Sequence, residues 1–391
     1  MNRNIVIIIA SALAMAPGLW IRLTHPEMAH WTEAALFGLA IVGGAFLLSW
    51  AAEVAQLEIS QGLALALLAL IAILPEYVVD ASFAWLAAED PAYASYAVAN
   101  MTGANRLLIG IAWPLVLVIA YMRFRKTSVS LEKGHGLELV ILLAASLYAL
   151  VLPLKGSISL VDFVVLVALF VYYIYRIARL PAEPPHLVGP AQTIGELPKS
   201  RRRLATAVMA LAPAAVILLV AESFAEALVE TGVEFGIDEF LLVQWLAPLA
   251  SEAPEFVVVS LFAWRGLTTP ALGALVSSKI NQWTLLVAML PLIYSIALGA
   301  PEALQLDDRQ KEEVLLTAAQ SIFAVVLLLD LRLSLYGAAA LFGLFATQLA
   351  FPDTRGTITV VYFVLSVLVL FSTRRLVLET IRSVFRREPL D

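Results

Sequence analysis

The 391-residue sequence has no cysteine and only four histidines, and 14% of its residues are charged. The absence of cysteine excludes disulfides, thiolate catalysis and cysteine-ligated metals. The histidines, at positions 25, 30, 135 and 186, fall in predicted loops and form no obvious set of ligands. No stripe of basic residues indicates a nucleic-acid partner. No constellation of His, Cys or Ser with a base lies at membrane depth, which argues against an enzyme.

Hydrophobic residues make up 61% of the chain. A soluble domain is nearer half apolar and a quarter charged. The excess is grouped into runs of about 20 residues, the length that crosses a bilayer as a helix. The sequence therefore predicts an all-α polytopic membrane protein with about 12 transmembrane helices. The expected segments lie near 4–23, 33–56, 60–87, 92–122, 136–154, 159–180, 204–230, 239–265, 269–298, 312–331, 333–351 and 357–378.

Lysine and arginine are concentrated in alternate loops. With the N-terminus inside, the inner loops and the tail carry most of these residues, including Arg123 to Lys133 and Arg201 to Arg203. Because basic residues favour the cytoplasmic side, both termini are expected in the cytoplasm, in the cell (inner) membrane. The first segment has a poor cleavage site, so it is interpreted as a retained helix rather than a signal peptide.

The two halves of the chain share an internal sequence. Residues 75–85 and 254–264 are identical at seven of eleven positions at a constant offset of 179. Chance similarity between apolar segments is the alternative, but a matched Pro-Glu and a matched Phe-Ala-Trp argue against it. Each repeat is predicted to have five helices, and an odd number places the second copy upside down in the membrane. The predicted parts are 1–32 (an extra helix), 33–180 (first repeat), 181–203 (a cytoplasmic linker), 204–351 (second, inverted repeat) and 352–391 (an extra helix and a basic tail).

Each repeat places a glutamate directly after a proline, as Pro75-Glu76 and Pro254-Glu255. A carboxylate within an apolar span is costly unless it is paired, hydrated or protonated, so it marks a candidate functional site. Proline interrupts a helix, and freed backbone groups at membrane depth are tolerated only beside a cavity or other protein. Carboxylates and carbonyls together are the hard oxygen ligands that suit Na⁺ or Ca²⁺. The alternative is a kinked helix in which each glutamate pairs with a nearby base.

These segments resemble the α-repeats of the calcium/cation antiporter superfamily, which includes the sodium/calcium exchangers. Those repeats carry Thr-Ser-x-Pro-Glu, followed in the next helix by Gly-Asn-x-x-Gly-Ser-Asn-x-x-Asn. The resemblance covers roughly residues 33–351 and implies that Glu76 and Glu255 are the central ligands of a bound cation. Further oxygen ligands are implied at matching positions of the motifs, namely Ser251, Asn100, Asn105, Ser278 and Gln282.

The sequence also departs from the family pattern. Two acids are added, Asp80 four residues after Glu76 and Glu252 three residues before Glu255, so each could share a helical face with its glutamate. Two bases enter the same region, Arg106 and Lys279, and each is expected to pair with one of these acids. Arg106 is predicted to be a fixed counter-charge. Lys279 is predicted to be a switchable one that competes with the cation.

The leading hypothesis is a secondary cation antiporter that exchanges Ca²⁺ or another cation for H⁺ or Na⁺. A transporter of an anionic or zwitterionic solute, bound by Arg106 and Lys279, is a second possibility. A third is a non-transporting protein that keeps the fold and uses its buried charges as structural pairs. No organic cofactor is expected. The resemblance implies Ca²⁺ or Na⁺ as the bound ion, and protons and membrane lipid complete the expected partners.

Overall fold

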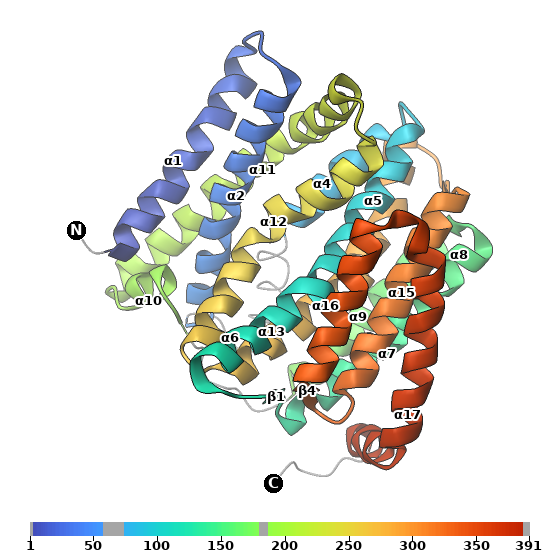
Figure 1. Ribbon diagram of the computed structural model, residues 1–391. Helices are drawn as coiled ribbons and strands as arrows, with labels where there is room; N and C mark the ends of the chain where they lie inside the picture. Colours follow the sequence, from blue (N-terminus) through green and yellow to red (C-terminus); the bar gives the residue numbers. More distant parts are fainter. Residues whose placement is uncertain (1–2, 58–73, 180–186, 386–391) are drawn as a thin grey trace. The chain divides into compact units, whose positions relative to one another are not determined.

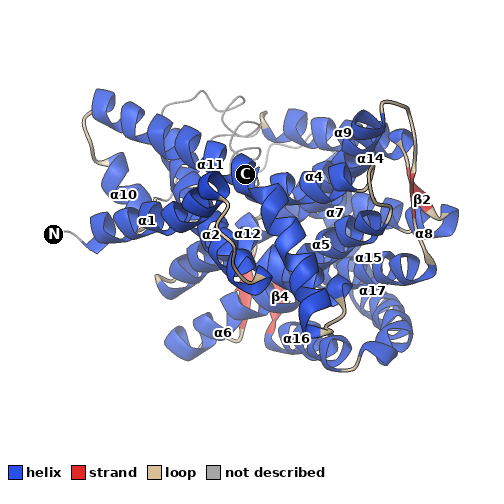
Figure 2. Ribbon diagram, turned by 90° about the horizontal axis from the view of Figure 1, so that it is seen from above, coloured by secondary structure: helices blue, strands red, loops and turns tan. Residues whose placement is uncertain are grey.

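The computed structural model describes residues 3–57, 74–179 and 187–385. These residues are almost entirely helical, with only short strands between the helices (Figure 2). The predicted all-α class is therefore confirmed. The chain divides into two compact units, Met1–Met101 with Ile174–Phe256 (unit 1) and Thr102–Tyr173 with Val257–Asp391 (unit 2). Each unit is described by itself.

Unit 1 is built around the long helix α2, which packs on both α1 and α11 (Figure 1). Its core contains Trp50 and Val54 of α2, with Met209 of α11 and Ala191 of α10. Gly43 lets α1 and α2 approach closely, because a Cβ there would lie 2.5 Å from the carbonyl oxygen of Ser11. The elements of unit 1 are α1 (Arg3–Thr24), α2 (His30–Ala55), α4 (Leu74–Leu86), α10 (Pro190–Gly195) and α11 (Lys199–Phe235), with most of α5 (Ala92–Leu107) and the first part of α12 (Glu239–Trp264).

Unit 2 contains the remaining helices and all the strands in the described part of the chain. Its elements before α12 are η1 (Leu108–Ala112), α6 (Trp113–Phe124), β1 (Ser128–Ser130), η2 (Lys133–His135), α7 (Gly136–Ala149), α8 (Val151–Lys155), β2 (Ser157–Ile158) and most of α9 (Leu160–Ile177). Those after α12 are α13 (Thr268–Asn281), η3 (Gln282–Leu286), α14 (Val287–Leu298), β3 (Leu304–Gln305), α15 (Asp308–Leu328), β4 (Arg332–Ser334), α16 (Leu335–Ala350), η4 (Pro352–Thr354) and α17 (Arg355–Phe385).

The connections in unit 2 show that two equivalent helices run in opposite directions. Helix α7 leads from β1 to β2, and α15, which packs against it, leads from β3 to β4. β1 pairs with β4 and β2 pairs with β3, both antiparallel. The start of α7 therefore lies beside the end of α15, and the end of α7 beside its start. The two helices occupy the same place in the two predicted repeats, so their opposite directions agree with inverted repeats.

A second equivalence lies in two π-helical turns. Leu108–Ala112 follows α5 and Gln282–Leu286 follows α13, and both turns interrupt otherwise continuous helices. Their offset of 174, from 108 and 282, is five less than the 179 of the Pro-Glu motifs. The sequence accounts for the difference by a longer loop after Trp85 in the first copy. Because π-turns occur often at functional sites, the residues just before these two turns are candidates for a functional role.

Several helix ends follow from local sequence. Asp307 begins α15 with a capping box, in which its carboxylate accepts from the N–H of Gln310 and the Gln310 side chain accepts from the N–H of Asp307. Ser334 begins α16 by accepting from the N–H of Gly337. These contacts satisfy backbone donors that a helix start would otherwise leave unpaired.

The predicted count of 12 spans is not confirmed. Within the described ranges eight helices are long and apolar enough to cross a membrane, or nine if the two parts of α12 form one span. Helix α16 has only 16 residues, and most of the 60–87 segment before Pro75 lies outside the described residues.

The predicted linker at 181–203 differs from expectation where it is described. It contains the short helix α10, and Arg201 to Arg203 lie in the first turns of α11 rather than in a loop. The two predicted proline breaks have different outcomes. Helix α12 is bent by 55° between Glu239–Ala253 and Glu255–Trp264, as expected for Pro254. Pro75 lies at the start of α4, and the residues that would complete the break are outside the described part.

Candidate functional site

The first Pro-Glu motif places two acids inside unit 1. Glu76 and Asp80 lie one turn apart on α4, with exposures of 4% and 0%. Asp80 Oδ1 accepts a hydrogen bond of 2.7 Å from Asn100 Nδ2 on α5. Asp80 Oδ2 has no hydrogen-bond partner among the described residues. Two predicted site residues, Asp80 and Asn100, are therefore brought together, and the partner of the buried carboxylate is a neutral amide.

The second motif also lies in unit 1, on α12. Glu252 is buried, and Glu255 is partly buried near the bend of the helix. The Ser251 hydroxyl lies within 3.2 Å of the carbonyl oxygen of Ala247 and 3.3 Å of that of Pro248. A hydroxyl that donates to its own helix keeps its oxygen lone pairs for another ligand. Ser251 can thus serve as a neutral oxygen ligand beside the two acids.

In unit 2 the predicted residues Lys279 and Asn105 contact each other directly. Lys279 Nζ donates to the backbone carbonyl of Asn105 at 2.8 Å and also to its side-chain oxygen. Both residues are fully buried, and the ammonium group lies 5.3 Å from the centroid of the Trp283 ring. Lys279 and Asn105 occupy equivalent positions in the two repeats, at the offset of 174 that relates the π-turns. A contact between equivalent residues is expected where a two-fold axis passes between the repeats.

The other predicted residues of unit 2 stand next to this contact in the chain. Ser278 is partly buried on α13, and Gln282 is buried at the first position of η3. Both belong to the helix that carries Lys279. Ser278 and Gln282 thus lie on consecutive turns of one continuous helix.

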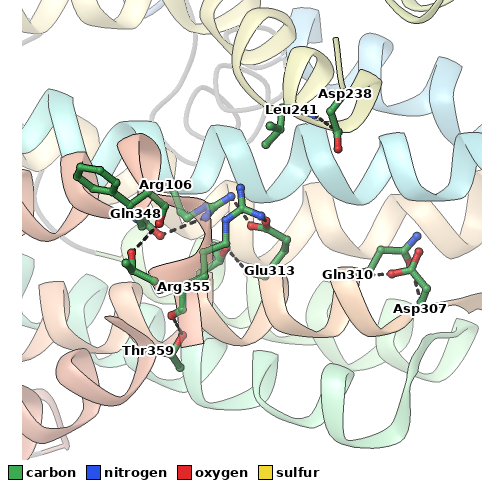
Figure 3. Close-up of polar contacts among 12 residues, drawn as sticks. Arg106, Asp238, Leu241, Asp307, Gln310, Glu313, Gln348, Arg355 and Thr359 are labelled. Carbon is green, nitrogen blue, oxygen red and sulfur yellow. Dashed lines mark hydrogen bonds and ion pairs between the residues drawn. The ribbon is translucent and has the colours of Figure 1, made fainter. Parts of the chain in front are cut away.

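Arg106 lies in a buried charge cluster of unit 2 (Figure 3). Its Nη2 is 2.5 Å from Glu313 Oε2, and the other carboxylate oxygen is 2.6 Å from Arg355 Nη1. Arg106 Nη1 also donates to Gln348 Oε1 at 3.2 Å. The cluster joins α5, α15, α16 and α17. The predicted partner of Arg106 was one of the acids around Glu76 and Glu255, but the carboxylate that pairs with it is Glu313.

Glu313 was not among the predicted site residues, although it lies in the charged first turns of α15, inside the expected segment 312–331. A signal was present in the sequence. Glu313, Thr317 and Gln320 recur at spacings of four and three along α15, and all three are fully buried. Such spacing places polar side chains on one helical face, which indicates a buried polar contact.

No group of three or more His, Cys, Asp or Glu within the described residues is arranged to hold a metal ion. A cation bound in unit 1 would therefore depend on few carboxylates supplemented by amide, hydroxyl and backbone oxygens. That donor set consists of hard oxygen atoms, which suits Ca²⁺ or Na⁺ better than a transition metal.

The helical fold matches that of known cation exchangers. The family model described as "Sodium/calcium exchanger protein" matches residues 30–178 and 205–352. The chain belongs to this family and is an integral membrane protein. The family resemblance inferred from the Pro-Glu motifs is confirmed. The family and the fold are those of transporters, not of enzymes.

Solved structures give the same fold. The crystal structure of the H⁺/Ca²⁺ exchanger CAX is 44% identical, covers 98% of both chains and has a TM-score of 0.94. The structure of native YfkE is 13% identical over 92% of this chain and 99% of that chain, with a TM-score of 0.66. The sodium-calcium exchanger NCX_Mj is 16% identical over 81% and 96%, with a TM-score of 0.53. The last two likenesses concern the fold alone. Comparison with curated proteins gives no match.

Proposed function

We propose that this protein is a cation antiporter that exchanges Ca²⁺ for H⁺ across the cell membrane. The observation that carries the proposal is the buried pair of acids on α4, where Asp80 is held by the neutral amide of Asn100. A carboxylate whose hydrogen-bond donor is uncharged can bind either a proton or a cation. The choice of ions is supported by the likeness to the H⁺/Ca²⁺ exchanger CAX.

Glu76 and Glu255 are the proposed central ligands of the cation. Ca²⁺ takes six to eight oxygens, so neutral ligands must complete its shell. Ser251 and Asn100 are the candidates within unit 1. Asp80 and Glu252, each within four residues of a central glutamate, are proposed to bind a proton or the cation in the same way.

Exchange follows from competition for the same carboxylates. A glutamate that holds a proton is neutral, so it loses most of its attraction for Ca²⁺, and a bound Ca²⁺ disfavours protonation. Two carboxylates that each release one proton balance the two charges of one Ca²⁺. Such compensation matters because uncompensated charge is costly within the bilayer.

A transporter of anions is less well supported. It would need Arg106 and Lys279 as substrate ligands, yet the first is paired with Glu313 and the second donates to Asn105. The cluster of Arg106, Glu313 and Arg355 instead fits the hypothesis that this part of the buried charge is structural.

The test is transport by the purified full chain in proteoliposomes. Vesicles loaded with Ca²⁺ should take up protons when an outward Ca²⁺ gradient is imposed, as measured with an internal pH dye. Parallel runs with Na⁺, K⁺ and Mg²⁺ identify the cation, and a pH gradient should drive Ca²⁺ flux in the reverse direction. If Ca²⁺ flux does not respond to the pH gradient but follows a Na⁺ gradient, the coupling ion is Na⁺ and not H⁺.

A further inference from the structure

Unit 2 contains a second cluster of titratable groups, which shares no residue with the cluster around Arg106. His135 ends the short η2 turn just before α7, and its Nδ1 contacts Glu138 Oε2 on the first turn of α7. The other oxygen of Glu138 accepts from Ser277 Oγ at 2.8 Å and from Tyr173 Oη at 3.0 Å. We propose that His135 and Glu138 form a proton-binding site through which protons pass between solvent and helix α13.

The two side chains are buried to different degrees. Glu138 is almost fully buried, whereas the His135 side chain keeps 26% of its surface exposed. The histidine is therefore the solvent-facing member and the carboxylate the inner one. Histidine is the side chain whose ordinary charge change falls between about pH 5 and about pH 8, so it can exchange protons with water at physiological pH.

The inner end of the cluster reaches the element that carries predicted site residues. Ser277 directly precedes Ser278 on α13, and Lys279 and Gln282 follow within two turns. Glu138 therefore links α7 to α13 through a hydroxyl, which can both accept and donate a proton. A proton held at Glu138 is therefore in hydrogen-bond contact with α13 through the Ser277 hydroxyl.

The proton transfer is balanced at each step. Neutral His135 takes a proton from a hydronium ion of the solvent on its second ring nitrogen, which leaves water, and becomes an imidazolium. It then gives its Nδ1 proton to Glu138, so that the imidazole returns to neutral and the carboxylate becomes a neutral acid. Return of that proton reverses the same two steps, and no other reactant is needed.

The groups around the pair come from three helices. Tyr173 on α9 is the titratable group that joins Glu138 from that side, and α13 contributes Ser277 and the backbone at Gly273, against which the imidazole packs. Lys279, the basic residue of α13, donates its hydrogen bond to Asn105. Glu132 precedes the turn and is exposed. Within these contacts the charge of the site is set by His135 and Glu138.

The molecule contains a natural control for this arrangement. His30 and Glu33 have the same spacing, with His30 Nδ1 3.5 Å from Glu33 Oε2, but their side chains are 50% and 29% exposed. That pair lies at the start of α2 in unit 1. A general effect of a His–Glu pair would appear at both places, whereas a proton path would be affected only at His135.

The first experiment measures proton binding without transport. The full chain, labelled with ¹⁵N-histidine in lipid nanodiscs, has four histidine signals, and loss of one in His135→Gln assigns it. The His135 signal should titrate, and its midpoint should fall by about one pH unit in Glu138→Gln because the imidazolium loses its carboxylate. A His135 signal that does not titrate, or that titrates identically in Glu138→Gln, would overturn the proposal.

The second experiment measures proton flux, and here the inference rests on the proposed function. His135→Gln should slow Ca²⁺-driven proton flux several-fold and change its pH profile, and His30→Gln should leave both unchanged. In His135→Ala, added imidazole should restore part of the flux. Equal flux and an equal pH profile in His135→Gln and wild type would refute the path. Absence of Ca²⁺-driven proton flux in the wild type would refute the proposed function instead, and the histidine titration would still decide the proton site.

Discussion

Unit 1 and unit 2 each bury a charged side chain, but they neutralise it differently. In unit 1 Asp80 accepts from the amide of Asn100, whereas in unit 2 Arg106 faces the carboxylate of Glu313, which Arg355 also contacts. A carboxylate held by an amide can still gain a proton or a cation at modest cost. A carboxylate between two guanidinium groups is already paired with permanent positive charge, because arginine keeps its proton at any accessible pH.

The difference separates exchangeable charge from structural charge. Removing one partner from a buried ion pair leaves an uncompensated charge, and this costs more than the pair itself contributes. Removing the negative charge of a titratable acid is tolerated, because its neutral form is already one of its functional states. Substitutions that leave the shape unchanged should therefore affect transport at the acids of unit 1 and folding at the Glu313 cluster of unit 2.

The largest expected effect is on transport. Glu76→Gln or Glu255→Gln should abolish cation exchange while the protein stays folded, because glutamine keeps the size and loses the charge that binds the cation. Flux in proteoliposomes measures the first property, and the thermal midpoint in detergent measures the second. The matched control is Glu89→Gln, the same change at an exposed position after α4. Wild-type flux in the double variant Glu76→Gln, Glu255→Gln would end the assignment of these residues as ligands.

The next effect is on stability. Glu313→Gln should lower the free energy of unfolding by about 3–5 kcal/mol, because Arg106 and Arg355 remain buried without their carboxylate. Unfolding of the full chain by denaturant in detergent measures this loss. The control is the neighbouring, exposed Glu312→Gln, which should change stability by less than about 0.5 kcal/mol. Equal unfolding midpoints for the two variants would remove the contrast between the units.

A smaller effect is expected on cation affinity. Lys279 donates to both oxygens of Asn105, one of the predicted neutral ligands. Lys279→Gln should free these oxygens and remove a positive charge, and we expect cation affinity to rise about tenfold, which corresponds to about 1.4 kcal/mol. Direct binding measured at several pH values tests this, with the exposed Lys199→Gln as the control. Unchanged affinity at every pH would mean that Lys279 does not compete with the cation and has a structural role.

More of the fold than of the site could be predicted from the sequence. Apolar runs located the helices, and the matched Pro-Glu motifs revealed the repeat, because both depend on local sequence. The strands β1 to β4 were not predicted, since stretches of two or three residues carry too weak a pattern. The partner of Arg106 could not be chosen either. Glu312 and Glu313 are adjacent and chemically identical, and only helix packing decides that Glu312 faces outward and Glu313 inward.

The smallest effect tests the amide that distinguishes unit 1. Asn100→Ala removes the hydrogen bond to Asp80 Oδ1 and should cost about 0.5–1.5 kcal/mol. Because the lost donor favoured the charged carboxylate, Asp80 should retain its proton more readily, and Ca²⁺ should displace it only at higher pH. The pH of half-maximal Ca²⁺ binding should therefore rise by up to about one unit. The control is Asn4→Ala, which loses amide hydrogen bonds to Gly189 and Thr193. If both variants bind Ca²⁺ with the wild-type pH dependence, the Asn100 amide does not tune Asp80, and the charge of unit 1 is as fixed as that of unit 2.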